Sequence, residues 1–283
     1  MKTKLLLTAF IALSGITAKA QLQVQPIVGS EAGFRVTSTL ISGEKDAVLI
    51  DVQFLISEAQ KVVDEIKQSG KHLTTVYITH WHPDHIFGST IIQQAFPDAK
   101  FVALPATVKE IKDSWQEKVK EWKGVYKDNL ADAVVIPEVL KGSTILLEGK
   151  KLEIHGPVQG DDTHNSYVYI PSIRTVVAGD IVYNGIYPWT REANKAQRQE
   201  WVKVLDKIAA LHPVKVVAGH KDPSKEDNVE TLAFMKDYLH FYDEARAAAD
   251  SKEAFIAKIK EKYPSLGLEV ILQLGAGAEY PEK

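Results

Sequence analysis

The sequence has 283 residues with 34 basic and 37 acidic side chains, a net charge of −3, and no cysteine. This length suffices for one large α/β domain with a full core, and the mild acidity disfavours nucleic acid or an anionic membrane as a partner. The absence of cysteine excludes disulfide bonds, thiolate metal ligands and a lipid anchor on an N-terminal cysteine.

Residues 1–20 are typical of a secretory signal peptide. Two lysines near the start precede a mostly apolar run, Leu5–Leu13, which is too short to span a bilayer comfortably. The tripeptide Ala18-Lys19-Ala20 fits a small-residue cleavage site. We therefore expect a periplasmic or secreted protein that starts at Gln21 and has no membrane anchor. Cleavage would remove three lysines and no acidic residue, so the net charge would become −6.

The mature chain opens with apolar runs that predict strands separated by glycine-containing turns. They cover Gln23–Val28, Gly33–Ser42 and Ala47–Ile50. A helix follows, because Ser57 and Gln60 have the spacing of a capping box and an apolar face recurs at helical spacing up to a glycine at position 70.

The segment Thr79–His85, with the sequence THWHPDH, concentrates the chemistry of the chain. It follows the apolar run Val76–Ile78, whose β-branched and aromatic residues predict a buried strand. Pro83 cannot donate to a sheet ladder, so the histidines lie where that strand ends. Strand ends of α/β proteins are where functional sites are usually built.

The spacing of these side chains indicates a metal centre. His80 and His82 are two apart on a nearly extended backbone, so they point the same way and can hold one ion together. Asp84 and His85 lie past the turn and can face a second position. Imidazole and carboxylate suit Zn²⁺, and two such ions about 3.5–4 Å apart make a hydrolytic centre.

An H-x-H-x-D-H motif after a strand resembles the signature of the metallo-β-lactamase fold superfamily. Two later strand ends, Gly179-Asp180 and Gly219-His220, fit the same pattern, and the resemblance covers roughly residues 22–222. It implies an α/β fold, a four-layer αββα sandwich formed by residues 21–283, with the site at one edge.

The resemblance also implies roles for individual residues. Asp180 would bridge two divalent ions, for which zinc is the favoured identity, and His220 would join Asp84 and His85 on the second ion. Asp51, which ends an early strand, would support the ligands by hydrogen bonding. On its own residue type it could equally be a turn former.

The third ligand of the first ion is the point where this chain departs from the superfamily pattern. A Gly-His-Thr-like turn is usual about ten residues before the proline that ends the next strand. Counting back from Pro171 leads to Asp161, whereas His164 is the histidine in that loop. We predict His164, because a third imidazole suits the site better, and keep Asp161 as the alternative.

Two aromatic segments and a helical extension surround these motifs. A helical insertion at about 106–128 carries Trp115 and Trp122 on one face, and the loop Tyr183–Trp189 follows the bridging aspartate. Each segment could pack the core or wall the substrate pocket. A helical C-terminal extension is expected at about 224–263, and the remaining tail shows no motif.

Two ions sharing a hydroxide would supply a nucleophile at neutral pH and stabilise an oxyanion. Asp84 could also deliver a proton to the leaving group, with Asp180 as the second catalytic carboxylate. We therefore expect a hydrolase of a small ester, lactone or amide, with β-lactams as one version except for the subclass with a cysteine ligand. The alternatives are an iron-dependent oxidoreductase resembling the sulfur dioxygenases and a non-catalytic metal-binding protein.

Overall fold

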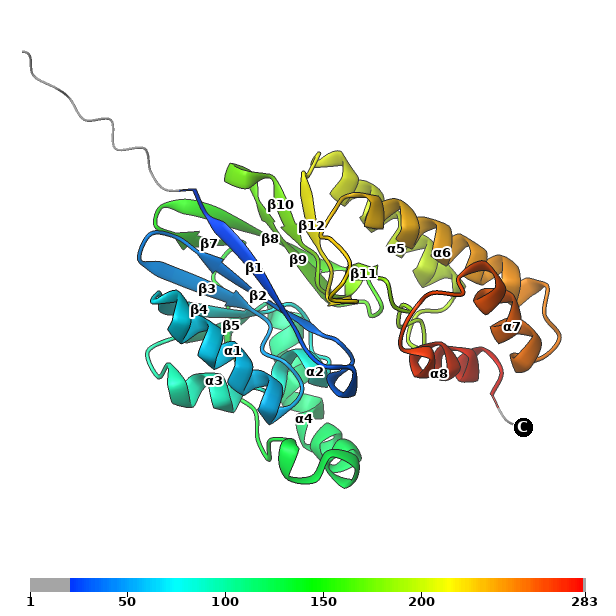
Figure 1. The fold of residues 1–283 in the computed structure, drawn as a ribbon, viewed down its shortest axis with the longest axis horizontal. Coiled ribbons are helices and arrows are strands. Elements are labelled where there is room, and N and C mark those ends of the chain that lie inside the picture. Colours follow the sequence, from blue (N-terminus) through cyan, green and yellow to red (C-terminus); the bar gives the residue numbers. More distant parts are fainter. Residues whose placement is uncertain (1–20, 282–283) are drawn as a thin grey trace, which may run out of the picture.

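The computed structural model describes residues 21–281, and the predicted signal peptide lies outside that range. Two β-sheets pack face to face and helices cover the outer face of each, which gives four layers (Figure 1). The predicted αββα sandwich is confirmed.

The first sheet has six strands and is formed by the N-terminal half of the chain. Its first three strands form antiparallel pairs, and the last four run parallel. In spatial order the strands are β1 (Gln23–Val28), β2 (Thr37–Ser42), β3 (Asp46–Ile50), β4 (His72–Ile78), β5 (Lys100–Ala103) and β6 (Glu138–Val139).

The second sheet has five strands and is formed mainly by antiparallel pairs. Its edge strand β12 runs parallel to β10, and a separate two-stranded ribbon pairs β11 with β13. The strands are β7 (Thr144–Leu147), β8 (Lys150–Val158), β9 (Asn165–Ile170), β10 (Thr175–Val177) and β12 (Lys215–Val217), and the ribbon strands are β11 (Tyr183–Asn184) and β13 (His220–Lys221).

Three apolar clusters hold the layers together, and β3 shows why. Successive side chains of a strand point to opposite faces. Val48 and Ile50 lie in the cluster between the sheets, together with Val168 of the second sheet. Leu49 faces the opposite way into the cluster beneath the helices. A strand buried on both faces requires a continuous apolar run, which is what the sequence has there.

The helices divide between the two outer faces, with α1, α3 and α4 beside the first sheet and α5 and α6 beside the second (Figure 1). The C-terminal extension is longer than predicted, because a last helix, α8, follows the expected ones. The helices are α1 (Ile56–Ser69), α2 (Pro83–Ile86), α3 (Ser89–Ala95), α4 (Pro105–Tyr126), α5 (Lys195–Ala210), α6 (Glu230–Ala247), α7 (Lys252–Lys262) and α8 (Glu269–Glu279).

The start of α1 differs from the sequence prediction. The helix begins two residues earlier, with Leu55 and not Ser57 at its N-cap, and the predicted capping box between Ser57 and Gln60 does not form. Instead, the Ser57 backbone N–H donates to Asn129 Oδ1 at 3.0 Å. Asn129, which is distant in sequence, therefore accepts the hydrogen bond from an N–H group in the first turn of the helix.

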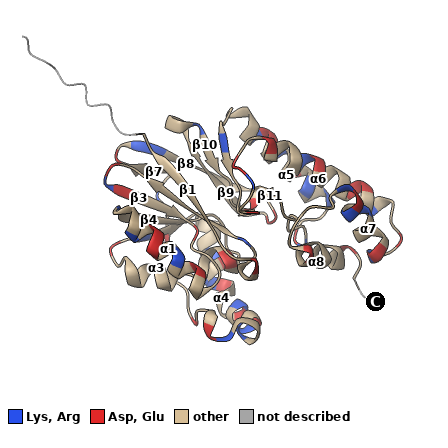
Figure 2. Cartoon of the chain, viewed as in Figure 1, with Lys and Arg blue, Asp and Glu red and all other residues tan. Residues whose placement is uncertain are grey.

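Basic and acidic side chains are interspersed along α5, α6 and α7 (Figure 2). Among residues 21–281, no helix combines the length and the hydropathy that crossing a membrane requires.

One ionised side chain ties the two sheets together at the end remote from the metal motif. The Glu148 carboxylate, in the β7–β8 turn, accepts hydrogen bonds from the backbone N–H groups of Glu44, Lys45 and Asp46 at 2.8, 2.6 and 2.9 Å. These bonds lower the Glu148 pKa from 4.5 to about 2, and the bond from the Asp46 N–H has the largest effect.

We predict that Glu148 contributes stability that depends on pH. Because its folded pKa is depressed, the contribution is complete above about pH 4.5 and disappears as the pH falls towards 2. Glu148→Gln should lower the melting temperature at pH 7 and flatten its decline over that window, as followed by circular dichroism. Glu44→Gln changes the charge equally in the facing turn and serves as the control. Identical pH profiles for wild type and Glu148→Gln would contradict the assignment.

Candidate metal centre

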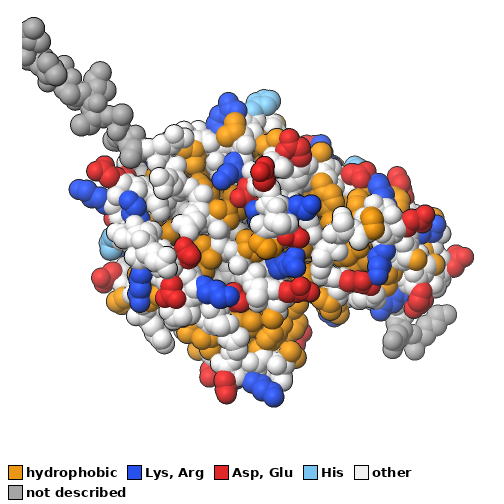
Figure 3. Space-filling model, in the orientation of Figure 1, with side chains coloured by type: hydrophobic (Ala, Val, Ile, Leu, Met, Phe, Trp, Pro, Cys, Tyr) orange, Lys and Arg blue, Asp and Glu red, His pale blue; other side chains and the backbone are white. Residues whose placement is uncertain are grey.

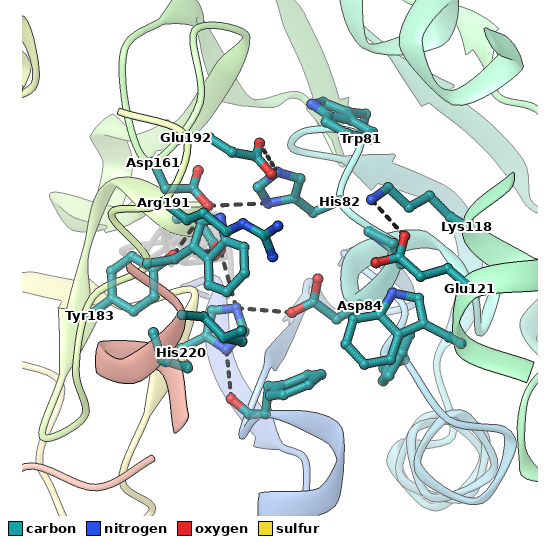
Figure 4. A pocket seen from close by; sticks show the side chains of 18 residues that line it. Trp81, His82, Asp84, Lys118, Glu121, Asp161, Tyr183, Arg191, Glu192 and His220 are labelled. Atoms are coloured by element: carbon teal, nitrogen blue, oxygen red, sulfur yellow. Dashed lines mark hydrogen bonds and ion pairs between the residues drawn. The ribbon is translucent and has the colours of Figure 1, made fainter. Parts of the chain in front are cut away.

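Six of the predicted ligands meet at one edge of the sandwich, where strands of both sheets end. They come from the loop after β4, from α2, from the turn η4 (Gly179–Ile181) after β10, and from β13, and several are visible in Figure 4. These residues are His80, His82, Asp84, His85, Asp180 and His220.

A first group of donor atoms comes from His80, His82, Asp161 and Asp180. Its donor atoms lie within 4.8 Å of one another, and all four residues are buried. The His82 Nδ1 lies 3.1 Å from Asp161 Oδ2, and the His80 Nε2 lies 3.7 Å from Asp180 Oδ2. As predicted, the two histidines point the same way, with ring centroids 4.7 Å apart.

A second group comes from Asp84, His85 and His220 and adjoins the first through Asp180. His220 Nε2 lies 3.2 Å from Asp84 Oδ2 and 3.1 Å from Asp180 Oδ2. The other oxygen of Asp180, Oδ1, lies 3.1 Å from His85 Nε2. The Asp180 carboxylate therefore stands between the two groups.

The structure places Asp161, and not the predicted His164, in the first group. The Asp161 backbone N–H donates to the Asp180 carbonyl, and its side chain is held inward by Asn165 Nδ2 at 2.8 Å. His164 lies on the outer side of the loop, 39% exposed, with its Nδ1 2.5 Å from Glu110 Oε1. The direction of this turn, rather than the ligand chemistry, decides which side chain points inward.

Asp51, directly after β3, holds the residues of the first motif by hydrogen bonds. Its backbone has a φ of 58°, and its carboxylate accepts hydrogen bonds from the N–H and hydroxyl of Thr79, each at 2.8 Å. His85 Nδ1 donates to the same carboxylate at 2.8 Å. The Thr79 hydroxyl, having donated to Asp51, accepts from His80 Nδ1 at 3.0 Å.

Each imidazole of the centre is oriented by a hydrogen bond from one ring nitrogen to an oxygen atom. His220 Nδ1 donates to the Phe34 carbonyl at 2.7 Å, and His82 Nε2 donates to Glu192 at 3.0 Å. A histidine whose one nitrogen carries a donated proton presents a lone pair on the other. The second nitrogens therefore face the shared carboxylates as potential ligands.

The donor set fits divalent metal ions. His80 Nε2 is buried and has no hydrogen-bond partner among the described residues, which is costly for a polar atom unless something else binds it. It faces the same point as the carboxylates of Asp161 and Asp180. Neutral imidazole and carboxylate bind zinc, iron and manganese, so the two groups fit two ions.

Burial and neighbouring charges shift the pKa values of the residues in the centre. Burial disfavours a charged His220, but Asp180 and Asp84 outweigh it and raise the His220 pKa to about 10. Burial raises the Asp161 pKa to about 7, and the nearby Asp180 carboxylate adds to this while His82 opposes it. Clustered carboxylates thus compete for positive charge, as a cation-binding site requires.

Two further residues of the site escaped sequence reasoning. The Tyr183 hydroxyl donates to Asp180 Oδ2 at 2.8 Å and lies 3.2 Å from Asp161 Oδ2. Burial and the two aspartates raise the Tyr183 pKa, so the phenol keeps its proton. Glu192 contacts His82. Both belong to the aromatic segment after Asp180 or follow it closely, and only that position hinted at a role.

The two predicted strand-end glycines are explained by a close contact between their loops. A Cβ on Gly219 would lie 2.3 Å from Asp180 Oδ1 and 2.4 Å from the Gly179 carbonyl carbon. The Gly219 N–H also donates to the Gly179 carbonyl at 3.0 Å. Only glycine allows His220 to approach Asp180 this closely.

The two donor groups open into a cavity of about 340 Å³. Both aromatic segments left open by the sequence contribute to it, since Trp122 of α4 and Tyr183 and Trp189 line it, whereas Trp115 does not. The remaining lining includes aromatic, aliphatic and charged side chains around the metal ligands (Figure 4).

A family model described as the Metallo-beta-lactamase superfamily matches residues 32–220. Curated proteins gave no significant match.

Solved structures share the fold at low sequence identity. The metallo-β-lactamase family protein TTHA1429 from Thermus thermophilus aligns with a TM-score of 0.65 and 16% identity over 92% of this chain and 91% of its own. The metallo-β-lactamase from Pontibacter korlensis gives 0.58 and 19% over 80% and 96%. The DIM-1 metallo-β-lactamase exposed to ceftazidime gives 0.57 and 19% over 80% and 95%.

We predict that Asp161→Ala loses one of two metal ions per chain, because it removes a buried carboxylate from the first group. His164→Ala should retain both ions and serves as the neighbouring control, since its side chain points away. Elemental analysis of the purified proteins measures the stoichiometry. If His164→Ala lost one ion and Asp161→Ala kept two, His164 and not Asp161 would be the ligand.

Proposed function

Because the chain belongs to the metallo-β-lactamase superfamily, we propose that it is a metal-dependent hydrolase of a small ester, lactone or amide. The observation that carries the proposal is the pair of adjoining donor groups that share Asp180 and open into one cavity. A reactive group in that cavity would lie against both groups at once. β-Lactams are amides and so remain one version of the substrate.

Residues from both groups would hold the metal ions. His80, His82 and Asp161 would hold one ion, Asp84, His85 and His220 the other, and Asp180 would contact both. Such ions, when bound, supply Lewis-acid chemistry, in that they acidify water and polarise a carbonyl group. The acceptors behind the histidines keep the ligand nitrogens aimed at this point without reorganisation.

Asp84 is the carboxylate placed to move a proton. It lines the cavity, its side chain is 15% exposed, and its Oδ2 faces His220 Nε2. Burial opposes its ionisation, but His85 and His220 hold the Asp84 pKa well below its usual range. The place of Asp84 at the cavity wall, rather than this low pKa, would allow it to pass a proton to a leaving group.

Tyr183 holds the Asp180 carboxylate in position through a hydrogen bond. The phenol donates to Asp180, and its ring stacks on His220 with a centroid distance of 5.3 Å and an interplanar angle of 5°. A neutral donor steadies the bridging carboxylate and adds no charge that would compete with the metal ions.

A second candidate, an iron-dependent oxidoreductase, is favoured by one observation. The first group contains two imidazoles and the Asp161 carboxylate where a third imidazole was expected, and a carboxylate in place of an imidazole favours harder ions such as Fe²⁺ over Zn²⁺. The second donor group argues for the hydrolase, because an oxygenase needs open positions on a single ion. Metal analysis of protein purified from its native source separates the two.

We predict that alanine at His80, His82, Asp84, His85, Asp180 or His220 removes metal and cuts turnover at least about a hundredfold. The assay is a panel of lactones, thioesters, phosphoesters and a chromogenic β-lactam. His72→Ala, a histidine 66% exposed and outside the cavity, is the matched control. Full metal content and a near wild-type rate in His82→Ala would refute the proposal.

We also propose that the protein is exported after removal of residues 1–20, on the strength of the basic, apolar and small-residue pattern of that segment. N-terminal sequencing of protein from the cell envelope or medium should begin at Gln21. An intact Met1 on protein recovered there would overturn the proposal.

A further inference from the structure

We propose that the substrate of this site carries an uncharged apolar chain, which lies between α4 and α8 while the reactive group lies at the metal ligands. The inference rests on the proposed hydrolase function for the reactive end of the substrate. It adds a subsite, built from the wall of the cavity opposite the ligands, and a preference for long acyl or alkyl substituents.

The first support is a group of aromatic side chains that forms one wall of the cavity. Phe34, Phe54 and Trp122 pack against one another with ring centroids 5.5–5.7 Å apart. Phe34 and Trp122 remain only partly buried, so their free faces are turned to the cavity. Apolar surface left open beside a reactive centre is suited to an apolar part of a ligand.

The opposite wall is apolar as well and comes from the C-terminal helix. Ile271 and Leu274 of α8 line the cavity, and Leu274 is half-buried. The two walls therefore face each other across a space that no side chain of the described residues fills. A chain of methylene groups placed there would bury apolar surface on both sides.

A second surface hollow adjoins the cavity. It shares Phe34, Trp122 and Leu274 with the cavity, so these three side chains lie at the boundary between the two hollows. The second hollow continues past Tyr126 to Val270, which is 49% exposed. The molecular outline is notched between α4 and α8 in Figure 3. A substrate can therefore extend beyond the metal centre towards solvent.

The α8 wall is firmly attached to the site. Gly267, just before the helix, donates to the Gly185 carbonyl at 3.0 Å and accepts from the Tyr187 N–H at 3.1 Å. Within α8, a Cβ on Gly275 would lie 2.6 Å from Thr190 Oγ1, so the helix packs directly on the loop after β11. The wall that α8 contributes to the cavity is therefore held in place by these contacts.

The charges around the outer hollow specify an uncharged chain. Its two carboxylate side chains, Glu31 and Glu269, are each paired with a basic side chain outside the lining, at 3.2 and 2.7 Å. Because both carboxylates already have basic partners, the hollow offers no uncompensated charge to an anionic or a cationic tail, and apolar contact remains as the source of affinity.

The experiment compares 4-nitrophenyl esters of acetic, butyric, hexanoic and octanoic acid on the metal-loaded protein, with the alkyl acetates as a parallel series. Each methylene buried from water is worth up to about fourfold in kcat/KM. In one of the two series the longest substrate should exceed the shortest by at least about tenfold.

Leu274→Gln should reduce the ratio of octanoate to acetate kcat/KM at least about fivefold, since it places an amide in the apolar wall of the cavity. Leu146→Gln makes the same change on a leucine that is 64% exposed on β7, away from the site, and should leave the ratio unchanged. A binding measurement without turnover uses 1-octanol, whose saturable effect on tryptophan fluorescence should weaken in Leu274→Gln. Ethanol is the short-chain control.

The outcomes separate this inference from the proposed function. Hydrolysis of the esters with no gain in either series and no saturable octanol binding would overturn the subsite and leave the hydrolase standing. Saturable octanol binding that Leu274→Gln weakens, in a protein that hydrolyses no ester, lactone or amide, would support the subsite and refute the hydrolase. A chain-length gain that Leu274→Gln leaves intact would also overturn the subsite.

Discussion

The Asp51 carboxylate is the contact on which the metal centre depends. It lies at the end of β3, accepts the N–H and hydroxyl of Thr79 at the end of β4, and accepts Nδ1 of His85 beyond the turn. Two neighbouring strand ends and the start of α2 are thereby held at one carboxylate that is 2% exposed. A carboxyl group this deeply buried needs hydrogen bonds to its oxygens, and here three donors supply them.

The consequence extends through the whole set of histidines. Each one donates a proton to an oxygen fixed by the fold, which belongs to Asp51, Thr79, Phe34 or Glu192. The other ring nitrogens of His80, His85 and His220 face Asp180, and that of His82 faces Asp161. Convergence of four imidazoles and several carboxylates would be unfavourable as a purely structural arrangement, because each is desolvated and like charges adjoin. The arrangement is therefore best explained by the cations it can bind.

Much of this was readable from the sequence, because the relevant signals are local. The strand before His80, the turn imposed by Pro83 and the glycines before Asp180 and His220 are each decided by neighbouring residues. Asp161 was not, since both it and His164 lie in one loop and only the backbone bond to Asp180 determines which points inward. Helix α8 also lacked a local signal, and its place depends on contacts with the loop around Thr190.

The helix that ends the described chain has a consequence for the order in which the protein matures. All the candidate ligands have been synthesised once His220 has left the ribosome, but one wall of the cavity comes from Ile271 and Leu274, which emerge later. Chains are synthesised from the N-terminus, and folded parts can form as they emerge. A nascent chain could thus present every ligand while its cavity still lacks the α8 wall, and complete the pocket only after that helix has emerged.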